Sequence, residues 1–466
     1  MAAEKYLDNI AVICENEKLL TYSQLENYIK HFADNIESRQ IVLIVTRNTI
    51  ASLIGYLGCM ENKSIPLLLR KNIDSDTVEK YVEDYDIKYV WLSEDLFDEK
   101  KGFLNRNCER VCRLFGYSLF DTGEFLKEVN KELALLLPTS GSTGNSKLVR
   151  ISYKNIESNT RNIAKYLNIT KNDKAITSLP MNYTYGLSVI NTHFYKKATL
   201  LMTERAPYEK EFWDFFNYYK GTSFAAVPYT YEILKKTGFA KKKVDTLHTM
   251  TVAGGKIGLE EEKYFIEYAT KNCKKFYVMY GQTEATARIS YRPSEMMLEK
   301  KESIGIPIPE GKMWIEDNEG NVVKECFIKG EIVYSGDNVT MGYAQEKGDL
   351  LKGYDWGNML HTKDIGYMDD DGYFYICGRK DRTAKLNGIR IELDELEKIL
   401  KNKFPKMDFN CKTEKCMDSV CFTRIKIICQ REKIVRHLEL EEVVMFISKK
   451  TGLSKRYFRI IEGVDV

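Results

Sequence analysis

Short apolar runs alternate with amphipathic helical patterns over most of this 466-residue chain. Thr21 lies three residues before Gln24, which predicts a capping box at the start of a helix. The run at residues 39–45 (RQIVLIV) that follows is typical of a buried strand. Strands alternating with helices are characteristic of α/β folds, so we expect a large N-terminal domain built on α/β sheets.

Beyond residue 300 the pattern changes to short strands separated by turn sequences. Asn318-Glu319-Gly320 and Asp371-Gly372 each lie between strand-like runs, and both predict β-hairpins. We therefore expect a β-rich subdomain in this part of the chain. A charged, glycine-containing segment at residues 378–400 then precedes an amphipathic helix, which predicts a connection into a smaller C-terminal domain.

Composition disfavours several functional classes. The net charge is only +3 and the charges are interspersed, so we expect neither nucleic acid nor a membrane surface as a partner. No leader-like N-terminus and no apolar run of membrane-spanning length is evident, which predicts a cytoplasmic protein without membrane insertion. The eleven irregularly spaced cysteines favour reduced thiols over disulfides or a zinc site. The absence of a G-x-S-x-G elbow and of paired histidines disfavours serine and zinc hydrolases.

The most informative segment is the run from Leu135 to Ser152 (LLLPTSGSTGNSKLVRIS). Its glycines allow backbone N–H groups to face an anion, its hydroxyls add donors and Lys147 adds a positive charge, as in a polyphosphate cradle. A Walker A loop requires glycine before the lysine, and Ser146 occupies that position, which disfavours a P-loop kinase. A flexible surface linker has a similar composition, so the loop alone leaves both interpretations open.

Four further segments accompany this loop in order: AGGK (Ala253–Lys256), YGQTEAT (Tyr280–Thr286), HTKDIGYMDDDGYFYICGRKDR (His361–Arg382) and KLNGIRIELDELE (Lys385–Glu397). With TSGSTGNSK, they resemble the signatures of the adenylate-forming superfamily of AMP-binding enzymes. That family includes acyl- and aryl-CoA synthetases, nonribosomal peptide adenylation domains and luciferases. The resemblance spans nearly the whole chain. It implies that a carboxylate attacks the α-phosphate of ATP, and that a thiol then attacks the acyl adenylate.

The resemblance also implies a role for each matching residue. Charge accumulates on phosphate oxygens in this reaction, so donors and cations are needed rather than an acid–base pair. Tyr280 would stack on adenine, and Asp364 would accept hydrogen bonds from the ribose hydroxyls. The implied catalytic residues are Thr283 at the α-phosphate, Glu284 as a ligand of Mg²⁺, and Arg379 near the ribose and phosphates. The implied nucleotide-binding set is Thr139, Ser140, Gly141, Ser142, Thr143, Gly144, Lys147, Gly254, Gly255, Tyr280, Gly281, Asp364 and Arg379.

The position of Asp381 matches the hinge about which the family's C-terminal domain moves between its two half-reactions. A charged hinge residue remains solvated in either arrangement. The implied organisation is an N-terminal AMP-binding domain at residues 1–379, a hinge at 380–382 and a small mobile α+β domain at 383–466.

The implied acid pocket differs from that of relatives that activate amino acids. The stretch Tyr183–Val189 (YTYGLSV) has Gly186 where those enzymes carry the aspartate that binds the substrate ammonium. A buried ammonium without a counter-charge is costly, so we expect a small carboxylic acid without an α-amine. The expected pocket residues are Tyr183, Tyr185, Gly186 and Gly254. The expected thiol is that of CoA or of the phosphopantetheine of an acyl or peptidyl carrier protein.

Two departures from the family pattern affect this interpretation. Ser146 and Leu148 replace a proline and a glycine that are frequent in the phosphate loop, which alters loop stiffness more than chemistry. The family's catalytic lysine follows a P-x-x-x-x-G-K pattern, and the closing SKRYFRIIEGVDV is similar to the stretch before that pattern. Two hypotheses therefore remain: an acid–thiol ligase whose natural chain continues to the lysine, or a non-catalytic protein that binds nucleotide or acyl adenylate.

Overall fold

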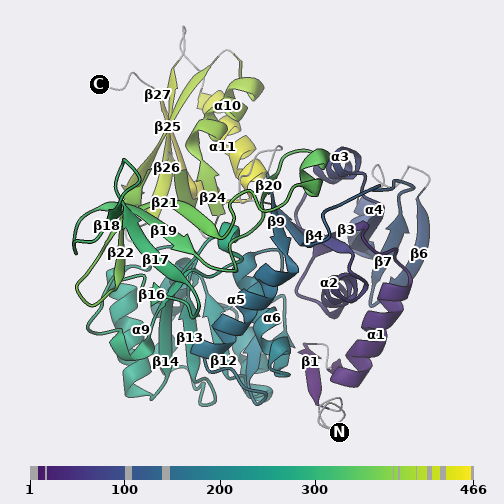
Figure 1. Ribbon diagram of the computed structural model, residues 1–466, viewed down its shortest axis with the longest axis horizontal. Coiled ribbons are helices and arrows are strands. Elements are labelled where there is room, and N and C mark those ends of the chain that lie inside the picture. The colour runs from purple at the N-terminus through teal and green to yellow at the C-terminus, as the bar shows by residue number, and fades with distance from the viewer. Residues whose placement is uncertain are drawn as a thin grey trace.

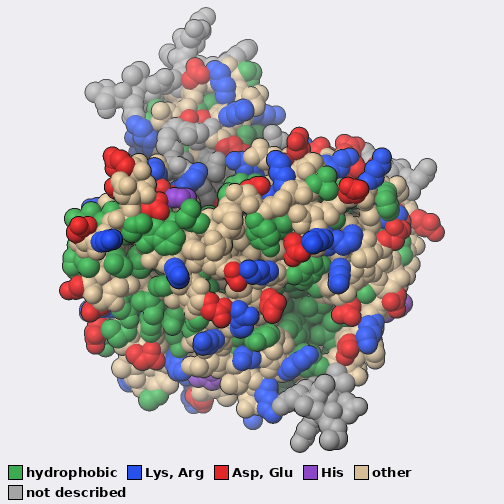
Figure 2. Space-filling model, in the orientation of Figure 1, with side chains coloured by type: hydrophobic (Ala, Val, Ile, Leu, Met, Phe, Trp, Pro, Cys, Tyr) green, Lys and Arg blue, Asp and Glu red, His purple; other side chains and the backbone are tan. Residues whose placement is uncertain are grey.

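The computed structural model describes residues 9–15, 18–99, 108–138, 147–380, 383–386, 389–405, 407–416, 422–430 and 437–462. Figure 1 shows two large sheets with helices packed against them, and a smaller C-terminal module at one end. No helix within these ranges combines the length and apolar character that a bilayer span needs. On the face shown in Figure 2, basic and acidic side chains are intermixed.

The first large sheet has eight strands within the described residues. Its order is β20 (Gly342–Ala344), β9 (Leu148–Ser152), β8 (Leu133–Pro138), β4 (Ile65–Arg70), β3 (Ile41–Thr46), β5 (Tyr89–Ser93), β7 (Tyr117–Asp121) and β6 (Glu109–Leu114). The central strands β8, β4, β3 and β5 are parallel, and the outer pairs are antiparallel. β3 is buried along its whole length, as its continuous apolar sequence predicts.

The second large sheet has nine strands within the described residues. Its order is β16 (Ile306–Pro307), β15 (Ser290–Arg292), β14 (Lys275–Tyr280), β13 (Thr249–Val252), β12 (Ser223–Ala226), β10 (Lys174–Ile176), β11 (Thr199–Met202), β1 (Ile10–Cys14) and β2 (Leu19–Thr21). The strands from β14 to β1 are parallel. The carboxyl ends of parallel strands share one edge, where binding loops gather in such sheets.

Helices fill the space between the two sheets and cover their outer faces. The inner helices are α1 (Tyr22–Asp34), α2 (Ile50–Asn62), α5 (Tyr153–Tyr166) and α6 (Thr184–Tyr195). The other helices of the N-terminal part are α3 (Ser75–Tyr85) and α4 (Glu94–Glu99), and α7 (Lys210–Tyr218), α8 (Pro228–Lys236) and α9 (Leu259–Lys271). Of these, α3 packs on the eight-stranded sheet, and α7, α8 and α9 pack on the nine-stranded sheet. The predicted capping box is confirmed: Thr21 Oγ1 accepts a hydrogen bond from Gln24 N, and the Gln24 side chain accepts one from Thr21 N.

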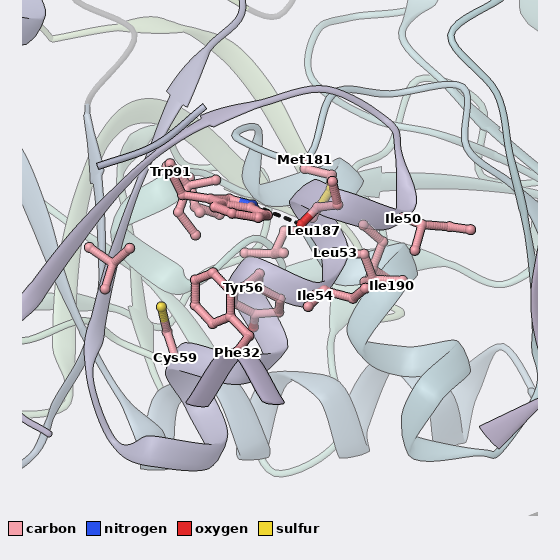
Figure 3. Packing of buried hydrophobic residues seen from close by; sticks show 14 of the residues in the cluster. Phe32, Ile50, Leu53, Ile54, Tyr56, Cys59, Trp91, Met181, Leu187 and Ile190 are labelled. Atoms are coloured by element: carbon pink, nitrogen blue, oxygen red, sulfur yellow. Dashed lines mark hydrogen bonds between the residues drawn. The ribbon is translucent and has the colours of Figure 1, made fainter. Parts of the chain in front are cut away.

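The inner core contains the aromatic side chains of Phe32, Tyr56 and Trp91 together with aliphatic side chains from α2 and α6 (Figure 3). Trp91 on β5 is fully buried, and its Nε1 donates a hydrogen bond of 2.9 Å to the Ala51 carbonyl on α2. Its ring packs edge-on against Phe32 on α1 with centroids 5.0 Å apart. Burial of one such side chain stabilises the fold by about 1.5–3 kcal/mol.

A five-stranded antiparallel sheet follows, in the order β18 (Val322–Val323), β17 (Lys312–Glu316), β19 (Gly330–Ser335), β21 (Met359–Met368) and β22 (Phe374–Arg379). Both predicted hairpins are confirmed, since β17 pairs with β18 and β21 with β22. Gly320 and Gly372 have φ of 84° and 81° in their turns, a conformation that favours glycine. The predicted β-rich subdomain is therefore present.

The C-terminal module contains the hairpin β23 (Thr383–Leu386) and β24 (Ile389–Glu392), the strands β25 (Asp408–Cys416), β26 (Phe422–Gln430) and β27 (Phe458–Glu462), and the helices α10 (Leu393–Lys403) and α11 (His437–Thr451). These elements share a hydrophobic core of their own. The module contacts the larger part through Arg70, which donates to the carbonyls of Lys450 and Thr451, and through Arg456, 4.2 Å from the Tyr229 ring centroid. The hinge residue Asp381 lies outside the described residues, so the hinge stays a prediction.

Candidate active site

The two strands that flank the predicted phosphate loop are antiparallel neighbours, with Pro138 of β8 paired to Leu148 of β9. The loop residues Thr139, Ser140, Gly141, Ser142, Thr143 and Gly144 lie outside the described residues, and their roles stay predictions. Lys147 is described, and its ammonium lies 5.4 Å from the centroid of the Tyr343 ring. The loop's lysine is therefore placed beside β20, the strand that carries Tyr343.

Tyr343 connects Lys147 to the predicted magnesium ligand. The Tyr343 hydroxyl donates a hydrogen bond of 2.6 Å to Glu284 Oε1. Glu284 lies in a single 3₁₀ turn, η4 (Thr283–Ala285), just after β14, and it is buried. β20 holds Tyr343 in register by pairing it with Val149. Sequence reasoning missed Tyr343, because one tyrosine among 30 after a glycine gives no distinguishing pattern.

Tyr280, Asp364 and Arg379 form a second group. Tyr280 ends β14, and its hydroxyl donates a hydrogen bond to Asp364 Oδ2 on β21. Arg379 faces Asp364 across the β21–β22 ladder, and its Nε lies 3.1 Å from Asp364 Oδ1. Burial and the neighbouring Asp364 carboxylate raise the pKa of Tyr280 well above its usual range, so the phenol stays protonated and can donate. Three residues predicted from two separate motifs are thus brought together.

The loop between these groups is fixed by Asn338. The Asn338 amide donates to the carbonyls of Ala285 and Arg288, each at 2.8 Å. The Thr340 N–H donates to the Glu284 carbonyl at 3.0 Å. Ala287 has a φ of 109°, which is strained for a residue with a Cβ and typical of loops at functional sites. Asn338 was another residue that sequence reasoning missed.

Several buried polar atoms around this loop have no hydrogen-bond partner within the described part of the protein. They include Gln282 Nε2, Thr340 Oγ1 and Arg379 Nε. Buried polar groups are ordinarily hydrogen-bonded, and an unpaired one is costly. These unpaired polar atoms lie near Glu284 and Asp364. A polar ligand bound there would supply their missing hydrogen-bond partners.

Glycines at two positions are required by close packing. Gly254 has a φ of 88°, and a Cβ there would overlap the Tyr183 hydroxyl. Gly186 lies in the first turn of α6, where a Cβ would overlap the Pro180 carbonyl oxygen. Position 186, which is predicted to match the ammonium-binding aspartate of amino-acid-activating enzymes, therefore has no room for a side chain without a shift of the backbone.

A cavity lies between α5, α6 and the strands β10, β12, β13 and β14. Its lining residues are Ile163, Leu167, Ile169, Asp173, Ala175, Ile176, Tyr185, Ser188, Val189, Thr192, His193, Ser223, Phe224, Ala225, Thr249, Thr251, Met279 and Arg288. Of the four predicted pocket residues, Tyr185 lines it, whereas Tyr183, Gly186 and Gly254 do not. Sequence reasoning missed Arg288, which looks like an ordinary surface charge in the sequence.

A model of the AMP-binding enzyme family matches residues 1–344. The chain belongs to this family. The match covers most of the chain, so the resemblance drawn from the five motifs is confirmed, and the protein is an AMP-binding enzyme.

Relatives of this AMP-binding enzyme include CoA ligases. It is 24% identical over 428 residues to oxalate–CoA ligase from Arabidopsis thaliana, covering 85% of this chain and 81% of the relative. It is 24% identical over 405 residues to 2-succinylbenzoate–CoA ligase from Bacillus cereus (strain Q1), covering 84% and 80%.

A solved structure of o-succinylbenzoate CoA synthetase from Bacillus subtilis, bound with a product analogue, has a TM-score of 0.79 to this AMP-binding enzyme. The two are 19% identical, and the match covers 99% of this chain and 94% of the synthetase. The predicted fold, α/β with a β-rich subdomain and a small C-terminal domain, is thereby confirmed.

Proposed function

We propose that this AMP-binding enzyme is an ATP-dependent acid–thiol ligase. A carboxylate oxygen of the acid bonds to the α-phosphorus of ATP, and pyrophosphate leaves. A thiol sulfur then bonds to the acyl carbon of the adenylate, and AMP leaves. CoA is the preferred acceptor because both relatives carry it in their names. The phosphopantetheine of a carrier protein is the alternative acceptor of the same chemistry.

The convergence of two charged groups at one edge of the sheets carries this proposal. Glu284 with Tyr343 and Lys147, and Asp364 with Tyr280 and Arg379, come from six strands or turns spread between residues 147 and 379. Transfer of a nucleotidyl group requires fixed cations and donors around phosphate oxygens, together with a carboxylate for Mg²⁺. The arrangement supplies each of these.

The residues present fit ATP and Mg²⁺. Lys147 and the loop at residues 139–144 would hold the β- and γ-phosphates, Glu284 would hold Mg²⁺ and Asp364 would hold the ribose. Thr283 and Arg379 would contact the phosphates, and Gly254, Gly255, Tyr280 and Gly281 would lie against the adenosine. The unpaired Gln282 Nε2, within the described part of the chain, is a donor that a nucleotide would satisfy. Bound ATP·Mg²⁺ supplies the electrophilic phosphorus and a stable leaving group.

The acid is proposed to lack an α-amine. Gly186 packs on the Pro180 carbonyl, so no carboxylate from that position faces the pocket. The relatives' names give oxalate and 2-succinylbenzoate as acids for those enzymes, which makes a small organic acid the class to test here.

Exchange of labelled pyrophosphate into ATP tests the first half-reaction. A panel of acids that includes oxalate, 2-succinylbenzoate and α-amino acids should give exchange with at least one non-amino acid, dependent on Mg²⁺. Asp364→Asn should lower the exchange by raising the KM for ATP. The exposed Asp370, in the turn between β21 and β22, provides the matched control, because Asp370→Asn should behave as the wild type.

The second half-reaction is tested separately, with a chemically prepared acyl adenylate and either CoA or a phosphopantetheinylated carrier domain. Thioester should form with one of the two. A protein that binds ATP and acyl adenylate but catalyses neither half-reaction would be the non-catalytic binder, and the proposal would be wrong.

A further inference from the structure

One buried cation lines the cavity between α5 and α6, and the proposed reaction assigns it no part. Arg288 is only 2% exposed, and its guanidinium carbon lies 4.6 Å from the centroid of the Tyr185 ring. Its Nε makes no hydrogen bond to any residue in the described part of the chain. Among the residues that the structure describes, no carboxylate lies within ion-pair distance of it. A buried cation without a counter-charge is strongly disfavoured, so this position requires an explanation.

The other two fully buried arginines show how a structural arginine is accommodated in this protein. Arg150 lies 2.5 Å from Asp355 Oδ2 and donates to backbone carbonyls, among them that of Met341 at 3.0 Å. Arg292 lies 2.6 Å from Glu262 Oε1. Each therefore has a carboxylate partner within the protein. Arg288 differs from both because it lines a cavity, and the cavity lies where a carboxylate partner would be expected.

The groups around Arg288 do not supply the missing negative charge. Burial raises the pKa values of Tyr166 and Tyr183 to about 12, although the nearby Arg288 cation lowers them. Burial likewise raises the pKa of Tyr185. These phenols therefore remain neutral at physiological pH and can act only as dipoles beside the cation.

Asp173 is the carboxylate that lines the same cavity, and its charge is used elsewhere. Asp173 Oδ1 lies 3.0 Å from His248 Nε2, and Oδ2 accepts a hydrogen bond of 2.7 Å from the Thr170 N–H. Although burial opposes it, these contacts lower the pKa of Asp173 to about 2. Asp173 is therefore an ionised structural carboxylate that does not reach Arg288.

We infer that Arg288 binds a second anionic group of the acid, so that the substrate is a short dicarboxylic acid. This inference rests on the proposed ligase function. A planar guanidinium can donate two parallel hydrogen bonds to a carboxylate, which fixes both its position and its orientation. Tyr185 and Thr251, whose hydroxyl oxygens are 2.6 Å apart, line the same cavity and offer further hydrogen-bonding groups.

The walls and size of the cavity fit the remainder of such an acid. Ile163, Val189 and Phe224 provide apolar surface for a hydrocarbon spacer. The cavity volume is about 30 Å³, by the measure in which one water molecule needs about 10–15 Å³. That space is enough for a small polar group such as a carboxylate.

Pyrophosphate exchange with matched acids tests the inference. Each straight-chain diacid from malonate to suberate is compared with its monomethyl ester and with the monoacid of the same carbon number. For the diacid of the right length, kcat/KM should exceed that of both matched monoacids by about 10–100-fold. Arg288→Met should abolish that preference and leave the monoacids within about threefold of the wild type. Arg292→Met is the matched control, and it should keep the preference in whatever fraction folds.

Each other outcome has a distinct meaning. Exchange with no acid at all would contradict the proposed function rather than the role of Arg288. Equal use of diacids and monoacids, or an equal loss with both in Arg288→Met, would overturn the inference. In the latter case Arg288 would serve the reacting carboxylate.

A binding measurement without ATP gives a second readout. The preferred diacid should raise the Tm of the wild type but not that of Arg288→Met. Arg288→Lys covers the possibility that the methionine variant does not fold. Lysine keeps the positive charge but lacks the planar guanidinium group, so this variant should show a reduced preference for the diacid over the matched monoacids. The inference would also be overturned if Arg288→Lys kept the full preference for the diacid and the diacid did not raise the Tm of the wild type.

Discussion

Two parts of the candidate site differ in how their buried charges are paired. The nucleotide side consists of Glu284, Tyr343, Tyr280, Asp364 and Arg379, and the acid side consists of Arg288 and the cavity that it lines. On the nucleotide side, Asp364 already bonds to Tyr280 and lies 3.1 Å from Arg379, and Glu284 accepts a hydrogen bond from Tyr343. On the acid side, Arg288 is buried without a carboxylate partner among the residues that the structure describes. The first region holds its geometry before any ligand binds. The second region is proposed to be completed by the substrate.

This difference separates what the two regions contribute. A preorganised polar site lowers the cost of reorganisation during the reaction, and any acid substrate benefits from it equally. An unpaired buried cation lowers the stability of the free protein. Only the binding of a negatively charged ligand offsets that loss of stability. On the proposed function, the nucleotide side should therefore govern rate, and the acid side should govern selectivity.

The largest effect should come from comparing two buried arginines in the absence of ligand. Arg292→Met leaves Glu262 buried without its cation, so it should lower the free energy of unfolding by about 3–5 kcal/mol. Arg288→Met removes a charge that has no carboxylate partner in the described ranges, so it should leave stability unchanged or raise it by about 0.5–2 kcal/mol. Urea unfolding of both variants measures this. If Arg288→Met were destabilised as much as Arg292→Met, the comparison between the two regions would fail.

A change on the nucleotide side should alter rate without altering selectivity. Glu284→Gln keeps the size of the side chain but removes the charge proposed to hold Mg²⁺, so pyrophosphate exchange should fall about 100-fold. The Mg²⁺ concentration for half-maximal exchange should rise, and the order of preferred acids should stay the same. A changed acid order with an unchanged Mg²⁺ dependence would place Glu284 on the acid side instead.

The sequence predicted best those features that depend on local patterns. Thr21 with Gln24 formed the expected helix cap, and Gly320 and Gly372 formed the expected turns. Tyr280 and Asp364 could be identified because each belongs to a run of neighbouring motif residues, and the structure brings them together. Their contacts with the nucleotide stay predictions.

Features that depend on long-range packing could not be predicted in this way. Tyr343 matters because β20 places it against Glu284, 59 residues away. Arg288 follows a recognised motif by a few residues, yet arginine is mostly found at protein surfaces. Its burial depends on the folding of α5, α6 and β14 around it, which no local pattern encodes.

A smaller effect is expected at Gly186. Alanine there places a methyl group against the Pro180 carbonyl, which belongs to the backbone and cannot rotate away, so unfolding free energy should fall by about 1–3 kcal/mol. Chemical denaturation measures it. Gly353→Ala is the matched control, because Gly353 is exposed and has open space around it. A Gly186→Ala variant as stable as this control would mean that position 186 has room for a side chain, and the exclusion of α-amino acids would lose its support.

The smallest effect concerns the dependence of stability on pH at the acid side. Burial lowers the pKa of His193 below its usual value, although the Val189 carbonyl and the Asp173 carboxylate raise it. Below about pH 6.5 the unfolded chain binds a proton that the folded protein does not, so stability falls as the pH decreases, by up to about 1.4 kcal/mol per pH unit from this residue.

His193→Gln keeps a donor for the Val189 carbonyl, which His193 Nδ1 contacts at 2.8 Å, but cannot be protonated. Urea unfolding at pH 7 and pH 5.5 should therefore show a smaller loss of stability in His193→Gln than in the wild type. Asp173 stays ionised throughout this range because its pKa is about 2, so it does not add to the difference. Equal losses would mean that His193 is protonated in the folded protein. The acid side would then carry a second buried cation, and selectivity for diacids would no longer depend on Arg288 alone.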